Sequence, residues 1–126
     1  MTVSQGAPRP GGISIHAVDV AHGVPAAGLA VRLRRIEPMP CVLAEGACGP
    51  DGHFALPAST VQDLVRGDYD VEFAVADFYR TSGVALPRPP FVGVAVFRFG
   101  IDRLGEHFHL PLKFTPWGFS LFRGGS

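Results

Sequence analysis

The sequence predicts a single all-β domain, a two-sheet β-sandwich with one short helix. Apolar residues recur at every second position in several short segments, which is the pattern of a half-buried strand. Turn-forming residues separate these segments, since the 126 residues include 16 glycines and 12 prolines. The length is that of one domain. Many short strands joined by frequent turns are typical of a sandwich.

The first half of the chain contains three predicted strands and the helix. Residues 13–20 and 29–34 alternate apolar and polar side chains, and residues 53–56 form a short third strand. Residues 38–52 are expected to be a loop that ends in the turn Gly49-Pro50-Asp51-Gly52. The helix is expected between Ser59 and Gly67, about two turns long, with Ser59 or Thr60 as its cap.

The second half is expected to contain four more strands. Alternation predicts strands over residues 69–75, 91–99, 106–114 and 118–123, and the proline-rich stretch 81–90 is read as a short strand plus loop. In the segment 106–114, the period of two places His107, His109, Pro111 and Lys113 on one face. Phenylalanines and leucines occupy the other face, so one side is expected to be core and the other to carry chemistry.

Composition limits the possible partners. The net charge is zero, which argues against nucleic acid and membrane surfaces as partners. An apolar fraction of 47% is high for so short a chain, so part of the surface is expected to close against another subunit. Cys41 and Cys48 are expected to be reduced thiols. We expect a flexible arm over residues 1–12, one domain over residues 13–126 and, without a secretion segment, a cytoplasmic location.

Histidines are the candidate catalytic residues. His16, His53, His107 and His109 fall on predicted strands, and an imidazole can take and return a proton near neutral pH. Any one of them could instead be a structural histidine. The spacing of His107 and His109 would also suit zinc if His16 approached, but no cluster of Asp, Glu or Cys reinforces a metal site. Lys113, the single lysine, is either a rim residue or part of the chemistry.

The order and separation of four motifs resemble one known family. The motifs are Ile15-His16-Ala17-Val18-Asp19, Gly23-Val24-Pro25-Ala26-Ala27-Gly28-Leu29, His107-Phe108-His109-Leu110-Pro111-Leu112 and Phe122-Arg123-Gly124-Gly125-Ser126. Together they are similar to the 5-hydroxyisourate hydrolases, the enzymic relatives of transthyretin (prealbumin). The resemblance runs from about residue 13 to the last residue.

This resemblance implies a transthyretin-like sandwich that assembles as a homotetramer, a dimer of dimers, with active sites where the dimers meet. It implies hydrolysis of a small cyclic amide without a metal or other cofactor, in which a histidine draws a proton from water and cationic groups hold the oxyanion. The catalytic residues it points to are His16, His109 and, in the tail, Ser126, and we add Lys113 because the strand period places it on the face of His109. As substrate-binding residues we expect His53, which stands at the position of a family arginine, and also Val18, Pro111, Ser120, Phe122, Arg123 and Gly125.

Three elements of the family pattern differ in this chain. After Asp51-Gly52 the family carries an arginine, whereas this chain has His53, which cannot make a permanent bidentate contact. Lys113 stands where the family has a leucine. The carboxyl end has Phe122 where the family has a tyrosine, and one additional glycine.

These departures leave several interpretations open. In the first, the protein is a 5-hydroxyisourate hydrolase in which Lys113 replaces the positive charge of the missing arginine. In the second, the scaffold and the histidines serve another ring-opening, ring-closing or condensation reaction, with Lys113 as cation, base or nucleophile. A third interpretation is a small-ligand binder like transthyretin, and a fourth is a purely structural sandwich.

Overall fold

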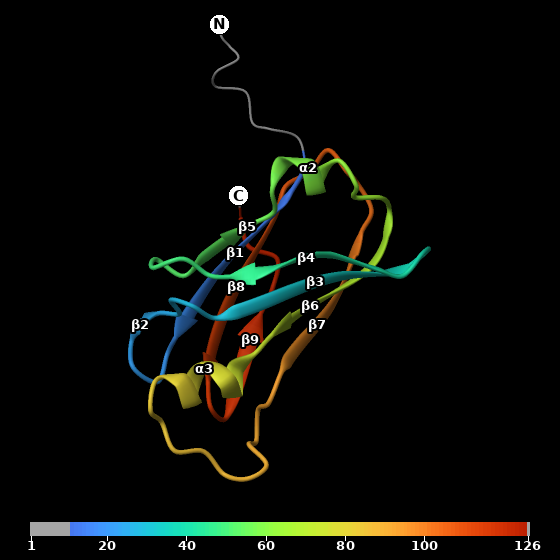
Figure 1. Ribbon diagram of the computed structural model, residues 1–126. Coiled ribbons are helices and arrows are strands. Elements are labelled where there is room, and N and C mark those ends of the chain that lie inside the picture. Colours follow the sequence, from blue (N-terminus) through green and yellow to red (C-terminus); the bar gives the residue numbers. More distant parts are fainter. Residues whose placement is uncertain (1–10, 126) are drawn as a thin grey trace, which may run out of the picture.

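Two β-sheets form the body of the protein in the computed structural model, which describes residues 11–125 (Figure 1). The first sheet runs in the order β2-β1-β8-β9, and β5 pairs with β1. Its strands are β1 (Ile13–Asp19), β2 (Val24–Pro25), β5 (His53–Ala55), β8 (Phe108–Thr115) and β9 (Gly118–Leu121). The second sheet consists of β4 (Cys41–Ala47), β3 (Ala30–Glu37), β6 (Gly67–Phe73) and β7 (Ala95–Ile101), in that order. The predicted all-β sandwich is therefore confirmed. Residues 1–10 of the predicted arm and Ser126 lie outside the described residues.

Strict alternation along β1 and β8 separates the core from an outer face. Ile13, Ile15 and Ala17 of β1 are buried, while the residues between them are only half-buried. The same holds for β8, where Leu110 and Leu112 point inward. The two strands are parallel neighbours. Because side chains of a strand alternate between faces, the polar residues of both strands share the outer surface of this sheet.

A second helix, α3 (Val75–Thr81), joins the end of β6 to the core. The predicted strand over residues 69–75 is wrong at its end, because β6 stops at Phe73. Val75 and Tyr79 lie one helical turn apart and are fully buried. The Tyr79 hydroxyl donates a 2.6 Å hydrogen bond to the buried Asp19 at the end of β1. This bond fixes α3 against the first sheet.

The predicted helix is present but shorter than expected. It is α2 (Ala58–Val61), a single turn that begins after Pro57 without any side-chain cap, so neither Ser59 nor Thr60 caps it. The two helices lie near opposite ends of the sandwich (Figure 1). Within residues 11–125, no helix is long and apolar enough to cross a bilayer.

Two further segments differ from the sequence prediction. The expected loop over residues 38–52 contains the edge strand β4, whose residues are mostly exposed and therefore show no apolar alternation. The strand expected over residues 91–99 is β7, shifted to Ala95–Ile101. Phe91, the apolar residue that set the predicted start, is 75% exposed and precedes the strand. In both places the residues concerned are largely exposed, so their hydropathy does not mark the position of the strand.

Candidate active site

The register of the first sheet gathers polar side chains from three strands on its outer face. β1 and β8 pair Ser14 with His109, His16 with Pro111 and Val18 with Lys113. On the other side of β1, His16 pairs with His53 of β5. Directly paired residues of neighbouring strands share a face of the sheet. The outer face therefore carries three imidazoles, from β1, β5 and β8, and we call it the histidine face.

His16 and His53 form a stacked pair at one side of this face. Their ring centroids are 4.2 Å apart and their planes are inclined by only 8°. The Nδ1 atom of His53 lies 3.1 Å from the Oδ2 atom of Asp51, and the His53 backbone N–H donates to the same carboxylate. These contacts, led by the backbone hydrogen bond, lower the pKa of Asp51. The carboxylate thus stays charged and can orient the His53 ring.

Gly52 allows β5 to lie against β1 at this point. Its φ angle is +81°, and a Cβ atom there would overlap the carbonyl oxygen of Ala17 in β1. The Ala17 N–H in turn donates to the Gly52 carbonyl at 2.9 Å. This close approach of the turn places His53, the next residue, beside His16.

His109 lies in a second hydrogen-bonded group on the same face. Its Nδ1 atom is 2.9 Å from the Ser14 hydroxyl, which is also 2.8 Å from the Nε2 atom of His107. Burial lowers the pKa of His109, and the neighbouring imidazoles of His107, His16 and His53 lower it further. His109 is therefore neutral near pH 7, the state in which an imidazole can accept a proton.

Other predicted site residues lie around these histidines. Lys113 is exposed, and Ser120 of β9 pairs with it across the strands. Val18 and Pro111 are half-buried on the histidine face. The register thus puts an ammonium group on the same face as the imidazoles.

The tail after β9 is only partly on this face. Gly124 forms a bridge with His109, and its N–H donates to the His109 carbonyl at 2.7 Å. Arg123, predicted to bind substrate, instead lies 4.1 Å from the centre of the Phe108 ring and donates to Glu106 at 3.1 Å. The guanidinium also donates to the His107 carbonyl at 3.2 Å, so Arg123 contacts the backbone beside the histidine face and no hydrogen bond joins it to an imidazole among the described residues.

The remaining residues of the tail were also predicted site residues. Phe122 is half-exposed and Gly125 is exposed. Ser126, predicted to be catalytic, lies outside the described residues.

Two members of the site were missed as site residues. Ser14 and His107 complete the hydrogen-bonded group of His109. The signal for Ser14 was present, because a residue two positions before His16 on a strand shares its face. His107 was among the candidate histidines but was not assigned a catalytic or substrate-binding role. Among the described residues, no three His, Cys, Asp or Glu side chains are arranged to hold a metal ion.

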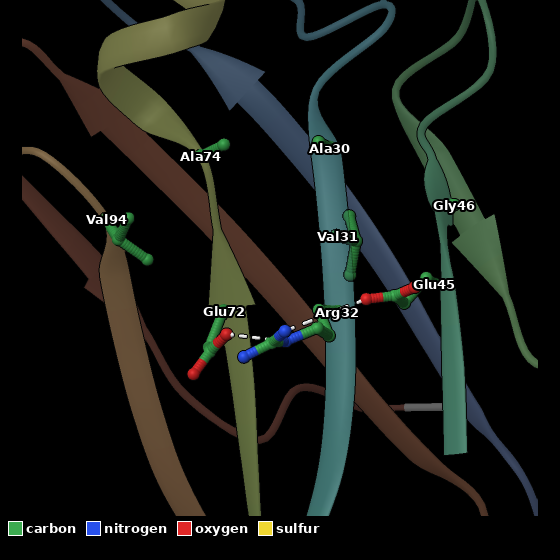
Figure 2. A pocket seen from close by; sticks show the side chains of 8 residues that line it. All are labelled: Ala30, Val31, Arg32, Glu45, Gly46, Glu72, Ala74 and Val94. Carbon is green, nitrogen blue, oxygen red and sulfur yellow. Dashed lines mark hydrogen bonds and ion pairs between the residues drawn. The ribbon is translucent and has the colours of Figure 1, made fainter. Parts of the chain in front are cut away.

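A separate hollow of about 370 Å³ lies on the four-stranded sheet (Figure 2). Arg32 crosses it, with its Nε atom 3.0 Å from Glu72 and its Nη1 atom 3.8 Å from Glu45. None of the predicted site residues line it. Its charged groups are paired with one another, whereas the histidine face is an open sheet surface in the isolated chain. We place the candidate site on the histidine face because the titratable groups converge there.

Comparison with known proteins identifies the family. The HIUase/Transthyretin family profile matches residues 13–124. A 5-hydroxyisourate hydrolase of Caulobacter vibrioides is 40% identical over 114 residues, which cover 90% of this chain and 97% of that protein. A 5-hydroxyisourate hydrolase of Ralstonia nicotianae is 37% identical over 119 residues, covering 90% of this chain and 98% of that protein.

The fold of this chain is also similar to that of a solved structure. The crystal structure of (S)-allantoin synthase superposes with a TM-score of 0.83 at 28% identity, covering 92% of this chain and 44% of that one. Fold, sequence profile and near full-length relatives agree, and the chain belongs to the HIUase/Transthyretin family.

Proposed function

We propose that this protein is a hydrolase that opens the ring of a small cyclic amide, with 5-hydroxyisourate as the substrate to test first. The observation that carries the proposal is the convergence of His16, His53 and His109 on one face of the first sheet. The hydrolases named above, similar over nearly their full length, support the choice of substrate.

His109 is the proposed general base. A water molecule held on the histidine face loses a proton to its Nε2 atom while the water oxygen bonds to the ring carbonyl carbon. The carbonyl oxygen becomes an oxyanion, which a positive charge stabilises. The carbon–nitrogen bond then breaks, and the ring nitrogen takes the proton back from His109. The lowered pKa of His109 suits this role, because the ring starts neutral.

Lys113 is the proposed source of positive charge. The family pattern has an arginine at the position of His53, and His53 is engaged by Asp51 and by the His16 ring. Lys113 is exposed on the same face and opposite Val18, with its ammonium free to swing toward a bound ring. Lys113 of β8 thereby supplies the positive charge that the family's arginine supplies from the position of His53 in β5.

We also propose that a second subunit closes the site, in a tetramer built from two dimers. The histidine face is open in one chain, and a small-molecule site is normally concave. Large apolar side chains are exposed, including Phe91 at 75% and Trp117 at 61%, with ring centroids 6.5 Å apart. Light scattering after size exclusion would show a mass of four chains. A monomer at micromolar concentration would contradict this arrangement.

The test of function is the decay of freshly generated 5-hydroxyisourate, followed by ultraviolet absorbance and corrected for spontaneous hydrolysis. We expect rapid decay with the protein and a loss of about 10²–10⁴-fold in kcat for His109→Ala. His16→Ala is expected to lose activity as well. A folded wild-type protein without any acceleration would contradict the proposal.

A second candidate function is a different ring-opening, ring-closing or condensation reaction on the same scaffold. The combination of His53 with Lys113 favours it, because both depart from the family pattern at the site. The likeness to (S)-allantoin synthase extends the same scaffold to a protein named for another reaction. Release of an unchanged ligand, with no turnover of any cyclic amide, would instead indicate a binder.

A further inference from the structure

The hydroxyl group of Ser14 lies between two imidazole rings. It is 2.8 Å from Nε2 of His107 and 2.9 Å from Nδ1 of His109. A hydroxyl has one proton, so it can donate to only one of the two rings and must accept from the other. The direction of the hydrogen bonds in this series, from His107 through Ser14 to His109, therefore decides which nitrogen of His109 carries a proton.

The direction of these hydrogen bonds is set at the His107 end of the series. The Nδ1 atom of His107 lies 3.1 Å from the carbonyl oxygen of Gly11, which can only accept. Nδ1 of His107 must therefore carry a hydrogen, and Nε2 of the neutral ring has the lone pair. Ser14 then donates to His107 and accepts from Nδ1–H of His109. Nε2 of His109 is left without a proton.

The Gly11 carbonyl is held in place by the backbone around it. The Gly11 N–H donates to the Gly105 carbonyl at 3.1 Å, and the Phe108 N–H donates to the Gly12 carbonyl at 2.9 Å. Two backbone hydrogen bonds thus tie residues 11 and 12 to the segment that leads into β8. Because the Gly11 carbonyl is a fixed acceptor, the series of hydrogen bonds has a single favoured direction.

We propose that Ser14 and His107 are positioning residues that hold His109 in the tautomer with an unprotonated Nε2. This inference rests on the proposed function, in which that atom accepts the proton of water. The arrangement needs no rearrangement during the step. When Nε2 takes the proton, the Nδ1–H bond to Ser14 is unchanged, and when the ring nitrogen of the substrate takes the proton back, the starting state returns. A site that is already organised lowers the barrier.

The groups that face His109 come from three strands and the segment before β8. They are His16 of β1, His53 of β5, His107 just before β8, and Lys113 farther along β8. Three of these four groups are imidazoles, like His109 itself. A rate profile alone therefore cannot assign the tautomer, and the test needs a direct observation of the ring nitrogens.

The test is nitrogen NMR of the full-length protein with ¹⁵N-labelled histidine, using long-range couplings to distinguish Nδ1–H from Nε2–H. We expect Nδ1–H for His109 in the wild type. Ser14→Ala should shift His109 toward Nε2–H, whereas Ser14→Thr keeps a hydroxyl and should keep the wild-type tautomer. His107→Leu removes the acceptor, so Ser14 can donate to His109 and should produce the same shift as Ser14→Ala.

Kinetics on the same variants give a second readout. Ser14→Ala is expected to lower kcat by roughly 10–10²-fold and to change KM by less than about threefold, because the base and not the binding is affected. Ser14→Thr should restore most of the rate. If turnover of 5-hydroxyisourate fails in the wild type, the proposed function falls, while the NMR result still decides the tautomer. Nε2–H on wild-type His109, or an unchanged tautomer in Ser14→Ala, would overturn the inference.

Discussion

Replacement of Gly124 by alanine tests whether the tail fixes the position of the His109 ring. A Cβ atom on Gly124 would lie 3.2 Å from Cδ of Pro111 and 3.3 Å from Cδ2 of His109. Two carbon atoms are most stable at about 3.5–4.0 Å. The backbone of Gly124 is fixed by its 2.7 Å bond to the His109 carbonyl. We therefore expect the His109 ring or the tail to move by about 0.3–0.7 Å.

The expected effect follows from this displacement. A misplacement of about 1 Å can cost about 10²-fold in rate, so roughly half of that distance should lower kcat about tenfold. The assay is the decay of 5-hydroxyisourate at saturating substrate. Gly118→Ala is the matched control, because it lies in the neighbouring strand β9 and a Cβ atom there would contact nothing within 4 Å. It should keep the rate within about twofold of the wild type.

Equal rates for the two alanine variants, with unfolding midpoints like that of the wild type, would refute this reasoning. The tail would then lie beside His109 without constraining it. Circular dichroism and thermal unfolding of both variants show that the comparison is made between folded proteins.

Three other measurements test separate parts of the structure. Because the pKa of His109 is lowered, the rate should fall as the pH is lowered, with a midpoint below pH 6.5. The free energy of unfolding should also fall below pH 6.5, where the unfolded chain binds more protons than the folded protein. Rate profiles and urea titrations across this range would show the two effects. Lys113→Leu should lower kcat/KM about tenfold through loss of a positive charge, and an unchanged value would make it a rim residue. Tyr79→Phe should cost about 1.5–3 kcal/mol in urea unfolding, since its hydroxyl bonds the buried carboxylate of Asp19. Tyr69→Phe should lower the free energy of unfolding by less, because the Tyr69 hydroxyl bonds only to backbone groups.

The strands that carry the site could be predicted because one of their faces is core. Along 13–17 and 108–114, apolar residues occupy every second position, so the outward positions of His16, His109 and Lys113 follow from the sequence. What alternation cannot give is which strands are neighbours. The parallel pairing that brings Ser14 beside His109 joins residues 95 positions apart.

The wrong prediction at the end of β6 has the same physical origin. Val75 continues the alternation of β6 in sequence, but it is buried as the first residue of α3, with Tyr79 one turn later. Burial against the core and the bond to Asp19 outweigh the local β preference of valine. Arg123 was expected at the site by resemblance, and its guanidinium contacts Glu106, the Phe108 ring and the His107 carbonyl. Side-chain direction in a short tail depends on contacts that hydropathy does not encode.

An arginine at position 53 would give the site a permanent positive charge, whereas His53 does not. A guanidinium is charged at all physiological pH values, whereas His53 is an imidazole stacked 4.2 Å from the imidazole of His16. Positive charges on both rings would repel each other, whereas burial and the neighbouring imidazoles lower the pKa of His109. An ammonium keeps its charge at pH values where an imidazole is neutral. Lys113 is therefore the group on this face that can stabilise an oxyanion while His109 is still free to accept a proton.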